Sequence, residues 1–127
     1  MQIRVIGAIG EQEMEQQVNA FVVGKKVIDI KFTEWGSITH QIGGYTCYVM
    51  YDENVAPTIN VQVKLFSAKG DQELQTKVNQ FLQGKTNVEI KFTEWVEAEH
   101  KDGGYSALVI YEAGRNASNQ AQQFNTI

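Results

Sequence analysis

The strongest constraint on the fold is an internal repeat of fifty residues. Residues 3–52 align with residues 63–112 at a constant offset of sixty and without a gap, and 21 of the fifty aligned pairs are identical. Identical strings include Lys31–Trp35 against Lys91–Trp95. Chance does not produce a gapless match of this length, so the chain is expected to consist of two copies of one structural module.

Each copy has the sequence pattern of a β-α-β-β unit. Short alternating apolar runs predict strands near residues 3–8, 27–35, 45–51, 61–67, 87–95 and 105–111. In the first helix, Met14, Val18, Phe21 and Val22 follow the i, i+4, i+7, i+8 spacing of one apolar face. The helices are therefore predicted near 11–23 and 71–83.

One helix over three strands buries too little apolar surface for a separate core, so the two copies are expected to share one sheet or to pack on each other and so complete one core. We predict an α+β fold, an antiparallel sheet with two helices on one side and a pseudo-twofold relation between the modules. The domain spans 1–127, with a first module at 3–52, a second at 63–112 and a polar tail at 113–127. The tail is predicted to be disordered unless Phe124 and Ile127 anchor it on a neighbouring chain.

The composition argues against two classes of partner, long nucleic acids and membranes. The net charge is −4 and the pI is near 5.1, which does not suit binding along the phosphates of a long nucleic acid. No apolar run reaches the length of about 18 residues that a membrane span needs. The single cysteine, Cys47, lies in a predicted strand and is expected to be a small buried side chain. With no signal-peptide pattern at the N-terminus, we expect a cytoplasmic protein, in the host-cell cytoplasm if a phage encodes it.

Residues for catalysis are sparse. The sequence contains no phosphate loop, no GxGxxG and no recognisable Ser/His/Asp set. His40 and His100 occupy equivalent loop positions, but two histidines alone do not fill a zinc site. They fit solvated loop residues or a ligand contact across the two copies. We therefore predict a protein that is not an enzyme and needs no metal or cofactor.

Five residues are candidates for ligand binding: Trp35, Trp95, Lys31, Lys91 and Arg115. An indole at the end of a strand can stack on a base or fill a protein interface, and it can equally pack under the following loop. The two lysines alternate onto the tryptophan face of each strand, where they would bind anions or be solvated. Arg115 follows the last strand and can reach a phosphate or belong to a flexible tail.

The second copy also resembles a known family. Val63–Ser67, Asp71–Leu82, Val88–Phe92 and Tyr105–Tyr111 are together similar to small single-module sporulation proteins of spore-forming bacteria. This resemblance implies a small non-enzymatic protein. In its size, acidity and duplicated α+β pattern, the whole chain resembles the phage anti-Thoeris sponges, which bind cyclic ADP-ribose signals between protomers without cleaving them.

Two functions are consistent with these features. The first is a non-enzymatic sponge for a small cyclic nucleotide of the cyclic ADP-ribose type, acting for a phage against host defence. The second is a sporulation-type structural or protein-interaction module without a small-molecule ligand. In either case, the exposed aromatic face and the edge strands predict self-association into a homo-oligomer.

Overall fold

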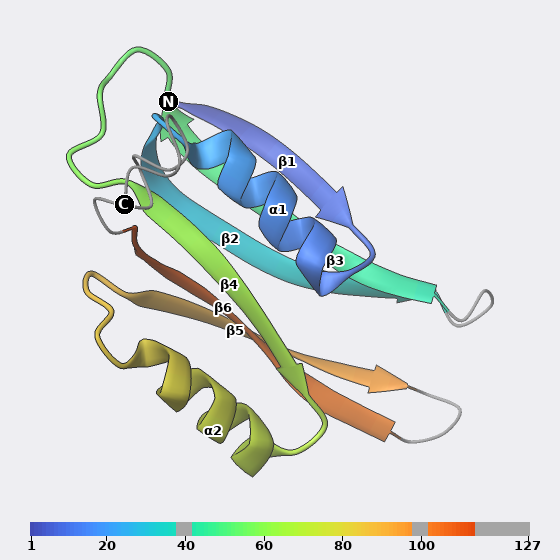
Figure 1. The fold of residues 1–127 in the computed structure, drawn as a ribbon. Helices are drawn as coiled ribbons and strands as arrows, with labels where there is room; N and C mark the ends of the chain where they lie inside the picture. The colour runs from blue at the N-terminus through green and yellow to red at the C-terminus, as the bar shows by residue number, and fades with distance from the viewer. Residues whose placement is uncertain (38–41, 98–101, 114–127) are drawn as a thin grey trace.

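A computed structural model describes residues 1–37, 42–97 and 102–113. The chain order within these residues is β-α-β-β followed by β-α-β-β (Figure 1). The elements are β1 (Gln2–Ala8), α1 (Glu11–Val22), β2 (Lys26–Ser37), β3 (Ile42–Asp52), β4 (Val61–Ala68), α2 (Asp71–Leu82), β5 (Glu89–Glu97) and β6 (Asp102–Glu112). All eight predicted elements are therefore present. His40, His100, Arg115 and most of the predicted tail, with Phe124 and Ile127, lie outside the described residues.

The strands form two antiparallel sheets with three strands each. Sheet 1 has the order β1-β3-β2, and sheet 2 has the order β4-β6-β5. The registers correspond, since Ile3 pairs with Met50 in sheet 1 and Val63 pairs with Ile110 in sheet 2. The antiparallel pairing is confirmed. The strands form two sheets that pack on each other, so the halves do not share a single sheet. Side chains of α1 form hydrogen bonds with the outer edge of β4, and β2 and β5 meet through side chains. Among the described residues, no backbone ladder joins the two sheets.

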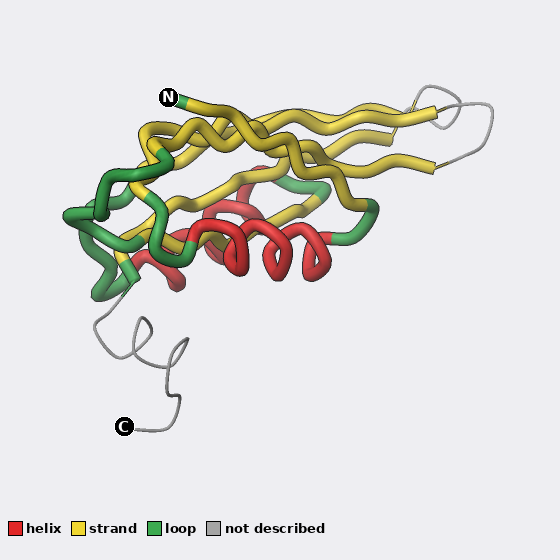
Figure 2. Tube along the Cα trace, turned by 90° about the horizontal axis from the view of Figure 1, so that it is seen from above, coloured by secondary structure: helices red, strands yellow, loops and turns green. Residues whose placement is uncertain are grey.

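The predicted pseudo-twofold relation is also wrong. A twofold axis between the halves would bring α2 onto β1 in the way that α1 lies on β4. Within the described residues, α1 packs along β4, whereas α2 packs on β4 and β6 of its own sheet and makes no comparable contact with β1. The two helices lie along the same side of the strands (Figure 2). The halves are therefore arranged head to tail. The outer edge of β4 is covered by α1, whereas the equivalent edge of β1 is exposed.

Two apolar clusters form the core. The larger one joins α1 and the inner face of sheet 1 to one face of sheet 2, which contributes Val63, Leu65, Leu108 and Ile110. The smaller one lies between α2 and the opposite face of sheet 2, which contributes Ala107 and Val109. Sheet 2 is thus covered on both faces: the first half of the chain, which we call module 1, packs on one face, and α2 packs on the other. Neither described helix is long and apolar enough to cross a membrane.

Cys47 is the buried side chain that the sequence predicted, and its thiol is expected to be inert in the native protein. Burial raises the pKa of Cys47 to about 12, so the reactive thiolate is nearly absent even at pH 9. We expect iodoacetamide at pH 8.5 to leave the native protein unmodified and to label it once per chain after unfolding in guanidinium. Mass spectrometry measures both states, and labelling of the native protein at the rate of a free thiol would contradict this.

Candidate functional site at the seam between β2 and β5

Four of the five candidate residues lie on the two strands that face each other across the boundary between the sheets. We call the facing edges of β2 and β5 the seam. Both strands run in the same direction (Figure 1). The seam is crossed by an ion pair from Asp29 to Lys91 and by a hydrogen bond from the Thr93 hydroxyl to Glu34. These contacts join residues about sixty positions apart, so equivalent positions of the two strands lie at similar heights along the seam.

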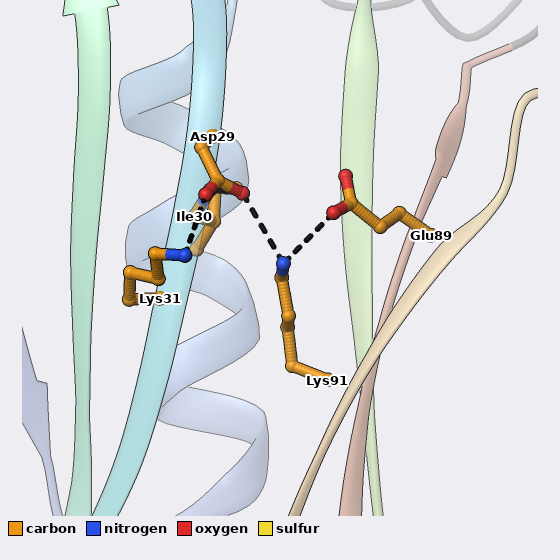
Figure 3. Close-up of polar contacts among 5 residues, drawn as sticks. All are labelled: Asp29, Ile30, Lys31, Glu89 and Lys91. Carbon is orange, nitrogen blue, oxygen red and sulfur yellow. Dashed lines mark hydrogen bonds and ion pairs between the residues drawn. The ribbon is translucent and has the colours of Figure 1, made fainter.

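The Asp29 carboxylate gathers lysines from both halves of the chain (Figure 3). Lys31 Nζ lies 3.0 Å from Oδ2, and Lys91 Nζ lies 3.4 Å from Oδ1. The Ile30 backbone N–H also donates to Oδ1 at 2.8 Å. Lys91 has a second acid partner, Glu89, at 2.8 Å. Two ammonium groups that are distant in sequence are therefore held by one carboxylate.

A local irregularity of β2 positions this carboxylate. The register of β2 against β3 shifts between Val27 and Asp29, which indicates a β-bulge. Beyond the shift, Asp29 pairs with Met50 and Lys31 pairs with Tyr48, so both side chains lie on the outer face of sheet 1. The bulge therefore sets Asp29 on the face from which it reaches Lys91.

The charges at the seam stabilise one another. Burial raises the pKa of Asp29, but hydrogen bonds from Lys31, the Ile30 N–H and Lys91 together outweigh it and hold that pKa below its ordinary value. The hydrogen bond to Glu89 is the largest of the causes that raise the pKa of Lys91, although partial desolvation opposes it. Both shifts favour the charged forms, so at neutral pH the Asp29 carboxylate and the Lys91 ammonium are ionised. The seam is thus a charged strip beside the larger apolar cluster, to which Leu108, the cross-strand neighbour of Lys91, belongs.

Each tryptophan packs on a glycine of the neighbouring strand. Trp35 pairs with Gly44, and Trp95 pairs with Gly104. A Cβ built on Gly44 would lie 2.6 Å from Cζ2 of Trp35, so the indole lies against the glycine backbone. Gly44 and Gly104 thus allow a close approach of the indole that a side chain at either position would block. One side of each indole is occupied by backbone, while Trp35 remains exposed and Trp95 half-buried.

The two lysines do not lie side by side on one exposed face. Lys31 is well exposed on the outer face of sheet 1. Lys91 is only partly exposed, because its cross-strand partner Leu108 is buried in the core that the two halves share. Sheet 2 turns its lysine face toward module 1, and the two lysines meet at the seam instead of lying side by side in solvent.

Sequence reasoning missed the acidic side chains of the seam. Asp29 and Glu89 are equivalent positions, and both lie two residues before a lysine, which is the one signal that could have pointed to them. Glu34, next to Trp35, accepts a hydrogen bond from the Thr93 hydroxyl at 2.9 Å. Arg115 and the two histidines cannot be related to the seam, since they lie outside the described residues.

The described residues contain no group of three or more His, Cys, Asp or Glu side chains arranged to hold a metal ion. Comparison of the chain with protein-family models, with curated proteins and with solved structures finds no match. What the seam offers is therefore defined by its own chemistry: cationic donors from both halves, ionised acids between them, and an indole further along each strand.

Proposed function

We propose that the protein binds a small cyclic nucleotide of the cyclic ADP-ribose type at the seam and sequesters it without cleaving it. The observation that supports this most is the convergence of Lys31 and Lys91 on Asp29. Each ammonium group has three donors, and the two lysines contact one and two carboxylates respectively, so donors remain for a ligand. A phosphate accepts such donors in charge-assisted hydrogen bonds.

The tryptophans supply the second element of recognition. Trp35 and Trp95 follow the lysines by four residues on strands that run in the same direction. A purine base can stack on the indole surface that the glycine leaves free, with a contribution of about 1–3 kcal/mol. A ligand with phosphates next to an adenine ring matches this order of lysine and indole. The resemblance to the phage anti-Thoeris sponges gives this binding its proposed role, removal of a host defence signal.

A second candidate function is the sporulation-type module that binds protein and no small ligand. It is favoured by the open β1 edge, where Ile3 and Val5 are exposed. A binding assay with the nucleotide separates the two proposals, since an interaction module would leave the nucleotide free.

Incubation with cyclic ADP-ribose isomers is expected to deplete the free ligand, and heat denaturation is expected to return it intact. Trp95→Ala should weaken binding about tenfold or more, because loss of one stacking surface costs at least about 1.4 kcal/mol. Calorimetry measures the affinities, and mass spectrometry identifies the released compound. Trp35→Ala tests whether both halves take part.

Two further variants control this experiment. Trp95→Ala also uncovers Gly104, so Lys31→Gln, at an exposed side chain, tests the site without altering the packing. Lys77→Gln makes the same charge change on α2 and should bind like the wild type. Recovery of a cleaved product would contradict sequestration. Wild-type affinity in Lys31→Gln and in both tryptophan variants would remove the seam as the binding site.

A further inference from the structure

Two side chains of α1 form hydrogen bonds with the backbone at the outer edge of β4. The Val63 N–H donates to Asn19 Oδ1 at 2.7 Å, and Asn19 Nδ2 donates to the Val63 carbonyl at 3.1 Å. One turn earlier on α1, Glu15 Oε2 accepts the Leu65 N–H at 2.6 Å. An edge strand normally leaves such groups open to another strand. Here α1 of the first half satisfies backbone groups on the edge strand β4 of the second half.

The side chains beside this edge are buried by the same contact. Val63 is 1% exposed and Leu65 is 2% exposed, and both belong to the cluster that contains α1 and Phe32. Phe32 itself is 7% exposed. The contact between the halves thus has two surfaces. We call Glu15, Asn19 and Phe32 the donor surface and the β4 edge with Val63 and Leu65 the acceptor surface; the two names refer to docking and not to the direction of the hydrogen bonds.

The first half carries a second acceptor surface that is open. Ile3 and Val5 of β1 are equivalent to Val63 and Leu65, and they are 58% and 56% exposed. Their register against β3 matches the register of β4 against β6, so the same backbone groups point outward from the edge. Four large apolar or aromatic positions line this surface: Ile3, Val5, Tyr48 and Met50.

The second half carries a second donor surface that is also open. The positions of α2 equivalent to Glu15 and Asn19 are Gln75 and Asn79, and both side chains are exposed. Asn79 offers the same amide as Asn19, and Gln75 offers an amide oxygen where Glu15 offers a carboxylate. Phe92, equivalent to Phe32, is 65% exposed. The residues that make the contact inside the chain therefore recur at exposed positions of β1, α2 and β5.

We propose that a second copy of this chain docks its α2 and Phe92 on the open β1 edge and repeats the α1–β4 contact between chains. The side-chain oxygen of Asn79 in one chain would accept the N–H of Ile3 in the other, and its amide nitrogen would donate to the Ile3 carbonyl. The side-chain oxygen of Gln75 would accept the N–H of Val5. Each chain has one open donor surface and one open acceptor surface, so two chains can satisfy each other in a closed dimer with two identical contacts. This inference is independent of the ligand proposed for the seam.

The test uses one variant of each surface in the full chain. Val5→Asp should disable the acceptor surface, and Phe92→Asp should disable the donor surface. A carboxylate buried without a partner should raise the dissociation constant about a hundredfold or more. Val55→Asp, at an exposed position in the linker, makes the same change as Val5→Asp and should leave the assembly intact. Val5 and Phe92 are both largely exposed, so each chain should keep its fold, which circular dichroism checks.

Mixing the two variants distinguishes a head-to-tail contact from any other. Light scattering after size exclusion should show a dimer for the wild type and monomers for each variant alone. The mixture should form a heterodimer, because its one remaining contact pairs an intact α2 with an intact β1. A monomeric wild type, unchanged assembly of either variant, or a mixture that stays monomeric at a concentration of several hundred micromolar would each overturn the proposal.

Discussion

Replacement of Leu108 by alanine is expected to lower the free energy of unfolding by about 2–5 kcal/mol. Leu108 is fully buried on the face of sheet 2 that packs against module 1, in the same cluster as Met14 and Val18 of α1. Its removal leaves a cavity between the halves that neither sheet can close without moving. The loss should therefore exceed what the lost apolar area alone would give.

Guanidinium unfolding, followed by circular dichroism at one fixed protein concentration, measures this change. Val55→Ala, at an exposed linker position, is the control and should alter the free energy of unfolding by less than about 0.5 kcal/mol. The Leu108 variant should also unfold in a single transition if the halves form one cooperative unit. A change below about 1 kcal/mol would mean that the boundary between the halves contributes little to stability.

The elements were predictable because their periodicity is local. The apolar spacing of Met14, Val18 and Val22 identifies α1, and these three side chains are buried as expected. The hairpin strands extend further than predicted: β3 begins at Ile42 and β6 at Asp102. Gly43 and Gly44 lie before the strand predicted near residues 45–51, but they pair with Gly36 and Trp35 inside the ladder.

The arrangement of the halves was not predictable, because the repeat makes the two edges nearly alike. Val63 and Ile3 are equivalent and chemically similar, yet one is buried and the other is exposed. Which edge is covered depends on where the linker allows α1 to pack, and no local pattern encodes this. The same symmetry in the sequence favoured a twofold axis, while the chain adopts a head-to-tail arrangement.

Of the residues at the seam, only the lysines and tryptophans could be predicted from the sequence. Lys31 and Lys91 stand out by alternation, and alternation also puts Asp29 on the face of Lys31, since the two lie two residues apart beyond the β-bulge. That Asp29 reaches Lys91 depends on how the two halves meet at the seam, which no local pattern shows. The acidic member of the site was therefore missed although the residues around it were found.

Gly104→Ala is expected to destabilise the fold by about 3 kcal/mol, at the upper end of the usual cost of overpacking. A Cβ at this position would clash with Cζ2 of Trp95 and would lie 2.6 Å from the carbonyl oxygen of Ala68. Real Cβ atoms do not approach other atoms this closely. The indole can swing away at the loss of its packing, but the carbonyl belongs to β4, whose Ala68 pairs with Tyr105 directly beside the glycine.

A double-variant cycle with Trp95→Ala separates these two clashes. In the Trp95→Ala background the indole clash is gone, so Gly104→Ala should cost less than in the wild type, and the residual cost reports the contact with Ala68. Gly10→Ser is the control, since a Cβ at Gly10 has no atom within 4 Å and serine at this helix N-cap can accept a backbone hydrogen bond. Chemical unfolding of the four chains of the cycle gives the coupling. Equal costs in both backgrounds would show that the indole does not lie on Gly104, and the aromatic platform of the seam would then lose its support.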